Sequence, residues 1–259
     1  MRIVSIDLHS DFGFFRKPET NGTINLSYNM IHKPAVLGIL GAIIGLDGYK
    51  EKGVIPEYYK LLGNLKIAIE PLAHDKGVYV KTAIKYTNTV GYANKGTNYL
   101  TEELTLIKPA YRVYLMLDME DVNQVKLLSY LQEALCDYIP YFGKNEFTAW
   151  WCKDSFNEYD FEVAHLESDQ GVIIRSLFLK SFVLKDYKGT PFVDMFSFDD
   201  SQGQDMPYTY FERLPLGFNE DLMQYDLYDF AYTTSPVKNA NVLDSLYLLK
   251  NENSYVQFF

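Results

Sequence analysis

The sequence is poor in cysteine and in long apolar runs, and each shortage excludes a class of protein. Its two cysteines, Cys136 and Cys152, have no metal-ligand spacing and give no disulfide framework, which favours a reducing, cytoplasmic setting. The longest apolar run, Ala35 to Leu46, has 12 residues, whereas a membrane span needs about 20. Polar residues interrupt the apolar stretch near the start, so we expect no signal peptide and no membrane partner.

Aromatic residues, in contrast, are plentiful, and charge is unevenly spread. Aromatics make up 16% of the 259 residues, and the net charge is −10, which excludes a uniformly basic nucleic-acid binder. Residues 1–120 carry a net charge of +2 and residues 121–259 a net charge of −12. The segment 76–99 interleaves four lysines with four tyrosines and contains no acid. Because phosphate binding responds to the local field, this segment can bind nucleic acid; a solvated lysine hairpin is the alternative.

Hydrophobic periodicity predicts the order of the elements. Helices are expected at 35–46 and 122–139, strands at 2–8, 65–72, 111–117 and 146–150, and a projecting hairpin at 77–107. This is the βαββαβ order of the ferredoxin-like fold with an extended middle hairpin. We therefore predict an α+β protein with a ferredoxin-like core in residues 1–150, which includes the extended hairpin at about 76–108. Residues 151–259 are expected to form a β-rich C-terminal region packed on the core.

The helix expected at 35–46 carries three glycines on one face. Gly38, Gly41 and Gly45 are spaced at i, i+3 and i+7. They do not follow a strand directly, as the glycines of a dinucleotide-binding fingerprint do. Since each glycine inside a helix costs about 1 kcal/mol relative to alanine, we expect this face to pack closely, most simply against the sheet.

Cations and aromatic residues come together in two loops of the N-terminal half. The first loop offers Phe15, Arg16, Lys17 and Tyr28, and Lys33 stands at the start of the helix. Guanidinium and ammonium groups suit phosphates, and aromatic rings suit stacked bases. On residue type alone, an ordinary solvated loop remains the alternative.

The second loop is PYFGKNEF, from Pro140 to Phe147. Gly143 allows backbone N–H groups to approach a phosphate, and Lys144 and Asn145 add side-chain donors. A plain glycine-based helix end is the alternative interpretation.

These segments resemble a known family. The order FRKP, a turn-rich loop, SY and then P-A-x-x-G-x-x-G-A-x-x-G, followed by KPA-Tyr111-Arg112 and PYFGKNEF, is similar to the RAMP-superfamily proteins of the fifth numbered family of CRISPR-associated (Cas) proteins. The segment YFERLPLGF, from Tyr210 to Phe218, resembles the C-terminal half of that family more loosely. The likeness covers about the first 150 residues, and it implies that the hairpin at about 76–108 is a thumb.

The resemblance implies a structural subunit of a type I Cascade surveillance complex in antiviral defence. Such a subunit holds the 5′ handle of the CRISPR RNA (crRNA), contacts the backbone and large subunits, and meets target DNA only through the complex. No cofactor and no metal are expected. The residues expected to contact RNA are Phe15, Arg16, Lys17, Tyr28, Lys33, Lys81, Lys85, Lys95, Tyr111, Arg112, Gly143, Lys144 and Asn145.

Two other functions stay open at this point. One branch of the family is a metal-independent endoribonuclease that processes precursor crRNA with a tyrosine, a lysine and a histidine directly after that lysine. This chain has no Lys-His pair; His32-Lys33 has the reverse order and is the best candidate, with Tyr28 or Tyr49. The other alternative is an assembly subunit that touches protein only.

Overall fold

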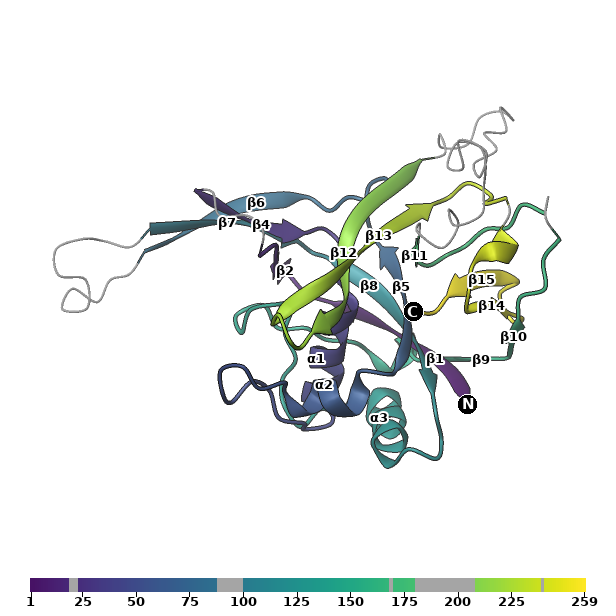
Figure 1. The fold of residues 1–259 in the computed structure, drawn as a ribbon, viewed down its shortest axis with the longest axis horizontal. Helices are drawn as coiled ribbons and strands as arrows, with labels where there is room; N and C mark the ends of the chain where they lie inside the picture. The colour runs from purple at the N-terminus through teal and green to yellow at the C-terminus, as the bar shows by residue number, and fades with distance from the viewer. Residues whose placement is uncertain (19–22, 88–99, 168–169, 180–207, 239) are drawn as a thin grey trace.

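The computed structural model describes residues 1–18, 23–87, 100–167, 170–179, 208–238 and 240–259 (Figure 1). It is a mixed α+β structure that is rich in strands, with three α-helices in the described ranges. Lys95 lies outside the described residues. No helix in the part of the chain that is described is long and apolar enough to cross a membrane.

A four-stranded antiparallel sheet lies at the centre, in the order β5-β8-β1-β9. Its strands are β1 (Arg2–His9), β5 (Lys66–Leu72), β8 (Ala110–Leu117) and β9 (Asn157–Tyr159). The first three confirm the predicted strands to within one residue. The fourth prediction, 146–150, is wrong, because Thr148 and Trp150 form only isolated bridges to Tyr141 and His9. The edge strand comes from further along the chain.

Two helices cover one face of this sheet. Helix α1 (Lys33–Ile43) and helix α3 (Val122–Glu133) share one apolar core with residues that alternate along β1, β5 and β8. Helix α3 ends earlier than the predicted Ile139, because Ala134 adopts a left-handed conformation with φ +50°. The chain then turns back over α1, where Tyr138 N donates to Ala42 O. A short helix, α2 (Glu57–Leu62), was not predicted.

Strands from the C-terminal part cover the opposite face. β10 (Phe161–Val163), β14 (Leu246–Leu249) and β15 (Ser254–Gln257) form a small antiparallel sheet. Its residues Leu249 and Val256 join a core with Ile3 and Tyr114 of the central sheet.

The predicted thumb is a projecting hairpin of β6 (Lys81–Thr87) and β7 (Leu100–Ile107) (Figure 1). Its base joins the first loop, since β7 also pairs with β2 (Phe12–Gly13) and, in parallel, with β4 (Ile24–Tyr28). β3 (Phe15–Arg16) pairs with β4.

A second long hairpin, of β12 (Thr209–Asn219) and β13 (Gln224–Thr233), passes beside α1. β11 (Phe178–Leu179) pairs with β13, and two single 3₁₀ turns, Lys153–Ser155 and Ala240–Val242, complete the described elements. This hairpin brings residues of the acidic half against the first loop and α1.

Candidate nucleic-acid interface

A cavity of about 740 Å³ lies beside α1. It lies between α1, the first loop, the segment that follows α3, and β13. Its aromatic lining consists of Phe14, Phe15, His32, Tyr49, Tyr58, Tyr138, Tyr141 and Tyr225. Its charged lining consists of Arg16, Asp47, Glu103 and Lys144. The size falls within the usual range of a ligand site, and the lining combines aromatic surface with a few charged groups.

The helix α1 supplies one wall of the cavity through its small residues. Ala35, Gly38 and Ala42 line the cavity one turn apart, leaving room above the helix. The glycines do not pack against the sheet as predicted. A Cβ at Gly41 would collide with Tyr58 of α2, and Gly38 faces the ring of the same tyrosine. The glycines therefore allow α2 to pack closely on α1, and this packing places Tyr58 in the wall of the cavity.

His32 caps the N-terminus of α1. Its Nδ1 accepts a hydrogen bond from Ala35 N at 3.3 Å, which satisfies one of the free N–H groups of the first turn. The rings of Phe15, Tyr28 and Tyr225 surround the imidazole. Burial lowers the pKa of His32 to about 3, so the ring is neutral at pH 7. It is placed as a packed cap, which does not favour a role as an acid or base near neutral pH.

The Gly143 loop packs directly on the first loop. Gly143 has φ +82°, and a Cβ there would collide with the carbonyl oxygen of Phe14. Phe14 N donates to Phe142 O at 3.0 Å. Gly143 thus allows close contact with the protein's own backbone, whereas the sequence suggested contact with a phosphate. This contact brings Lys144 and Arg16 to the same cavity.

The two cations of the cavity differ in their surroundings. Lys144 Nζ pairs with Glu103 at 2.8 Å and Glu146 at 3.1 Å, and lies 3.8 Å from the centre of the Tyr86 ring. Arg16 is exposed and forms no ion pair with a described residue. Asn145 is exposed next to Lys144. Arg16 is therefore the cation best placed to meet a phosphate.

Three aromatic residues expected to contact RNA are buried. Tyr28 and Tyr111 have no exposed surface and Phe15 has 3%. Tyr111 donates its hydroxyl to Asn29 O at 2.7 Å, and its ring packs on Phe15 and Tyr79. In this structure the three rings pack in the core and offer no open face to a base.

The other described lysines that were expected to contact RNA lie outside the cavity. Lys33 donates to the backbone oxygen of Phe259 at 3.1 Å, and burial lowers its pKa to about 8. Lys85 pairs with Glu102 at 2.9 Å on the thumb. Lys17 and Lys81 gather at the base of the thumb around Glu212.

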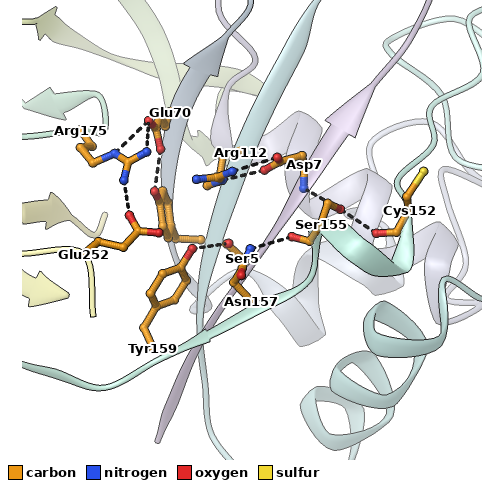
Figure 2. A network of polar contacts seen from close by, with 11 residues as sticks. Ser5, Asp7, Glu70, Arg112, Cys152, Ser155, Asn157, Tyr159, Arg175 and Glu252 are labelled. Atoms are coloured by element: carbon orange, nitrogen blue, oxygen red, sulfur yellow. Dashed lines mark hydrogen bonds and ion pairs between the residues drawn. The ribbon is translucent and has the colours of Figure 1, made fainter. Parts of the chain in front are cut away.

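Arg112 lies on the sheet face opposite the helices, in a polar network (Figure 2). Its guanidinium binds Asp7 through two hydrogen bonds of 2.7 and 2.9 Å, and these bonds raise its pKa. Beside it, Glu70 accepts from Arg175 and from the hydroxyl of Tyr114. Arg112 thus stabilises the sheet, far from the cavity wall formed by α1.

Of the three exposed tyrosines of the cavity, Tyr49 was named only as a candidate for RNA cleavage, and Tyr138 and Tyr141 were not predicted. Tyr49 is 61%, Tyr138 56% and Tyr141 43% exposed. They come from two segments, the one after α1 for Tyr49 and the one after α3 for Tyr138 and Tyr141. The tyrosine-rich composition was the only available signal, and it does not say which rings are accessible.

Comparison with known proteins supports the fold. The sequence matches no protein-family model and no curated protein. Solved structures similar to it include a chain of a CRISPR RNA-guided surveillance complex, with a TM-score of 0.48, 10% identity and coverage of 93% of this chain and 92% of that chain. A CRISPR protein from Archaeoglobus fulgidus is similar at a TM-score of 0.47, with 12% identity and coverage of 98% and 97%.

One further structure is similar over its whole length. It is a chain of the type III-B Cmr-beta complex, determined by cryo-electron microscopy with cognate target RNA and AMPPnP bound. The TM-score is 0.50 with 11% identity, and 99% of each chain is covered. At this identity the likeness is one of fold. The chain therefore has a strand-rich α+β fold similar to that of the Cmr-beta chain.

Proposed function

We propose that the protein is a crRNA-binding structural subunit of a CRISPR surveillance complex, which holds the 5′ handle of the guide in the cavity beside α1. The observation that supports this proposal most strongly is that three exposed tyrosines and the exposed Arg16 line one cavity of about 740 Å³. Single-stranded RNA is bound by this combination of aromatic stacking platforms and cations that contact phosphates.

The arrangement of the core supports the same proposal. The sheet order β5-β8-β1-β9, with α1 between β1 and β5 and α3 between β8 and β9, supports the proposal of a ferredoxin-like βαββαβ core. On this proposal residues 1–150 form the core, the hairpin at about 76–108 is the thumb, and the C-terminal region 151–259 packs on the core. The proposal further assigns the protein to a type I Cascade complex, in which it contacts the backbone subunit and the large subunit.

A salt series of RNA binding tests the proposal. The pure protein is titrated into labelled single-stranded RNA derived from a CRISPR repeat, with Arg16→Ala and Tyr138→Ala as variants. Loss of a stacking ring costs roughly 1–3 kcal/mol per base, so Tyr138→Ala is expected to weaken binding about 5- to 160-fold. Arg16→Ala is expected to flatten the salt slope by roughly 0.7, the value for one phosphate contact on a single strand.

Matched controls are Tyr228→Ala and Lys60→Ala, because both side chains are exposed and neither lines the cavity. Both are expected to bind like the wild type. Equal RNA affinity of Tyr138→Ala and Tyr228→Ala would show that the cavity is not part of the RNA interface. Absence of binding by the wild type would favour the protein-only assembly subunit.

The same RNA separates binding from processing. Metal-independent cleavage needs a base and an acid near the scissile phosphate, and His32 and Lys33 are both engaged in packing contacts. We expect the RNA to remain intact without added metal. Discrete cleavage products would overturn the structural role in favour of the endoribonuclease.

A further inference from the structure

Glu212 of β12 places a carboxylate at a point where several donors converge. Its side chain is 7% exposed. It accepts hydrogen bonds from the backbone N–H groups of Asn29, at 3.0 and 3.1 Å, and Met30, at 3.0 Å, and from the hydroxyl of Tyr210 at 2.8 Å. Consecutive backbone N–H groups aimed at one anion are the arrangement by which proteins also bind phosphate.

Two lysines complete this anion site. Lys17 Nζ lies 3.0 Å from Glu212 and over the ring of Tyr28. Lys81, on the thumb strand β6, is near enough to both that Glu212 raises its pKa and Lys17 lowers it, although burial is the larger influence and the pKa is lowered overall. The carboxylate of Glu212, from the acidic half, therefore forms an ion pair with Lys17 of the basic half.

The partly exposed position of Lys17 connects this site to the surface. The Lys17 side chain is 26% exposed, and Lys17 directly follows Arg16, which lines the cavity. Lys17 itself does not line the cavity, so a strand would meet Lys17 on the surface beside the cavity. In the described structure the charge of Lys17 is already matched by Glu212.

We infer that Glu212 is an internal anion that takes the place of a phosphate against Lys17 and so lowers the affinity of the protein for RNA of any sequence. Phosphate contacts carry no sequence information, so neutralising them lowers affinity for every strand alike. The inference rests on the proposed RNA-binding function and adds a limit on its sequence-independent part.

A purely structural role for Glu212, tying β12 to the first loop, is the competing explanation. Glu212→Gln separates the two, because the amide keeps a carbonyl acceptor and nearly the same shape but removes the charge. Glu220→Gln, at the exposed tip of the same hairpin, changes the net charge equally and is the matched control.

The test is binding of a 20-nucleotide oligouridine, which has no handle sequence. Glu212→Gln is expected to bind it roughly 3- to 10-fold more tightly than Glu220→Gln at low salt, with a salt slope steeper by about 0.7–1 for the released phosphate contact. Adding Lys17→Ala to Glu212→Gln is expected to abolish the gain.

Equal oligouridine affinity of the two glutamine variants, or a gain that survives Lys17→Ala, would overturn the inference. Thermal melting checks that each variant folds. If Glu212→Gln does not fold, Glu212→Asp, which withdraws the carboxylate from Lys17, is expected to give a smaller gain, and no gain would count against the inference. The cavity variants at Arg16 and Tyr138 test the proposed function separately, since they are measured on repeat-derived RNA.

Discussion

The imidazole of His32 ties the start of α1 to the aromatic wall of the cavity. It accepts from Ala35 N and is enclosed by the rings of Phe15, Tyr28 and Tyr225. Because burial lowers its pKa to about 3, the folded protein keeps this ring neutral over a pH range in which the unfolded chain, with an ordinary pKa of 6.5, becomes protonated.

This difference predicts a pH dependence of stability. Below pH 6.5 the unfolded state binds a proton that the folded state does not bind until about pH 3, so acidification destabilises the protein within that window. The contribution is about 1.4 kcal/mol per pH unit. His32→Asn keeps a residue that can cap the helix but cannot titrate. Between pH 6.5 and 5, its free energy of unfolding in urea should therefore fall less steeply than that of the wild type, by about 1.4 kcal/mol per pH unit.

His165→Asn is the control, because His165 is exposed. The stability of His165→Asn should fall on acidification as steeply as that of the wild type. A wild-type slope retained in His32→Asn would mean that the buried ring is not the source of the acid sensitivity.

At the scale of elements, the contact of α1 with α2 sets the width of the cavity. Tyr58 of α2 lies over two glycines of α1, one turn apart, and also lines the cavity. The two glycines have different amounts of room. A Cβ at Gly38 would meet the Tyr58 ring at an ordinary 3.7 Å, whereas a Cβ at Gly41 would overlap the Cβ of Tyr58.

The two positions should therefore respond in opposite directions to alanine. Gly38→Ala should stabilise the protein by up to about 1 kcal/mol through helix propensity. Gly41→Ala should destabilise it by roughly 1–3 kcal/mol, because α2 must move. Chemical denaturation measures both. Similar stabilisation by the two substitutions would show that α2 does not press on α1 at Gly41.

Elements with strong apolar periodicity were predictable, and those defined by tertiary contacts were not. The strands β1, β5 and β8 are buried on both faces of the sheet and appear in the sequence as continuous or alternating apolar runs. The six residues of α2 are too few to show a helical period. β9, with only three residues, was missed because its pairing with β1 is long-range.

At the scale of the whole molecule, the two oppositely charged halves neutralise each other at particular points. Glu212 from the acidic half pairs with Lys17, and the hairpin β12–β13 also contributes Tyr225 to the cavity. The expected cations do not lie on one face: Arg16 and Lys144 reach the cavity, whereas Arg112 lies on the opposite face of the sheet. A modest number of cations at the cavity suits binding in which stacking carries much of the affinity.

The candidate interface was predictable only in part, because the exposure of a side chain depends on the complete fold. Sequence patterns placed Arg16 and the Gly143 loop together, and the structure brings them to one cavity. Sequence alone could not separate the buried Tyr28 and Tyr111 from the exposed Tyr138 and Tyr141, since accessibility depends on the complete fold.

Ultraviolet crosslinking of repeat-derived RNA to the wild-type protein, followed by mass spectrometry of the crosslinked peptides, tests the central claim most directly. If RNA occupies the cavity, crosslinks should fall on the peptides that contain Tyr49, Tyr138 and Tyr141, and excess unlabelled handle RNA should remove them. Crosslinks confined to the C-terminal strands β10, β14 and β15, with none on these peptides, would contradict the account.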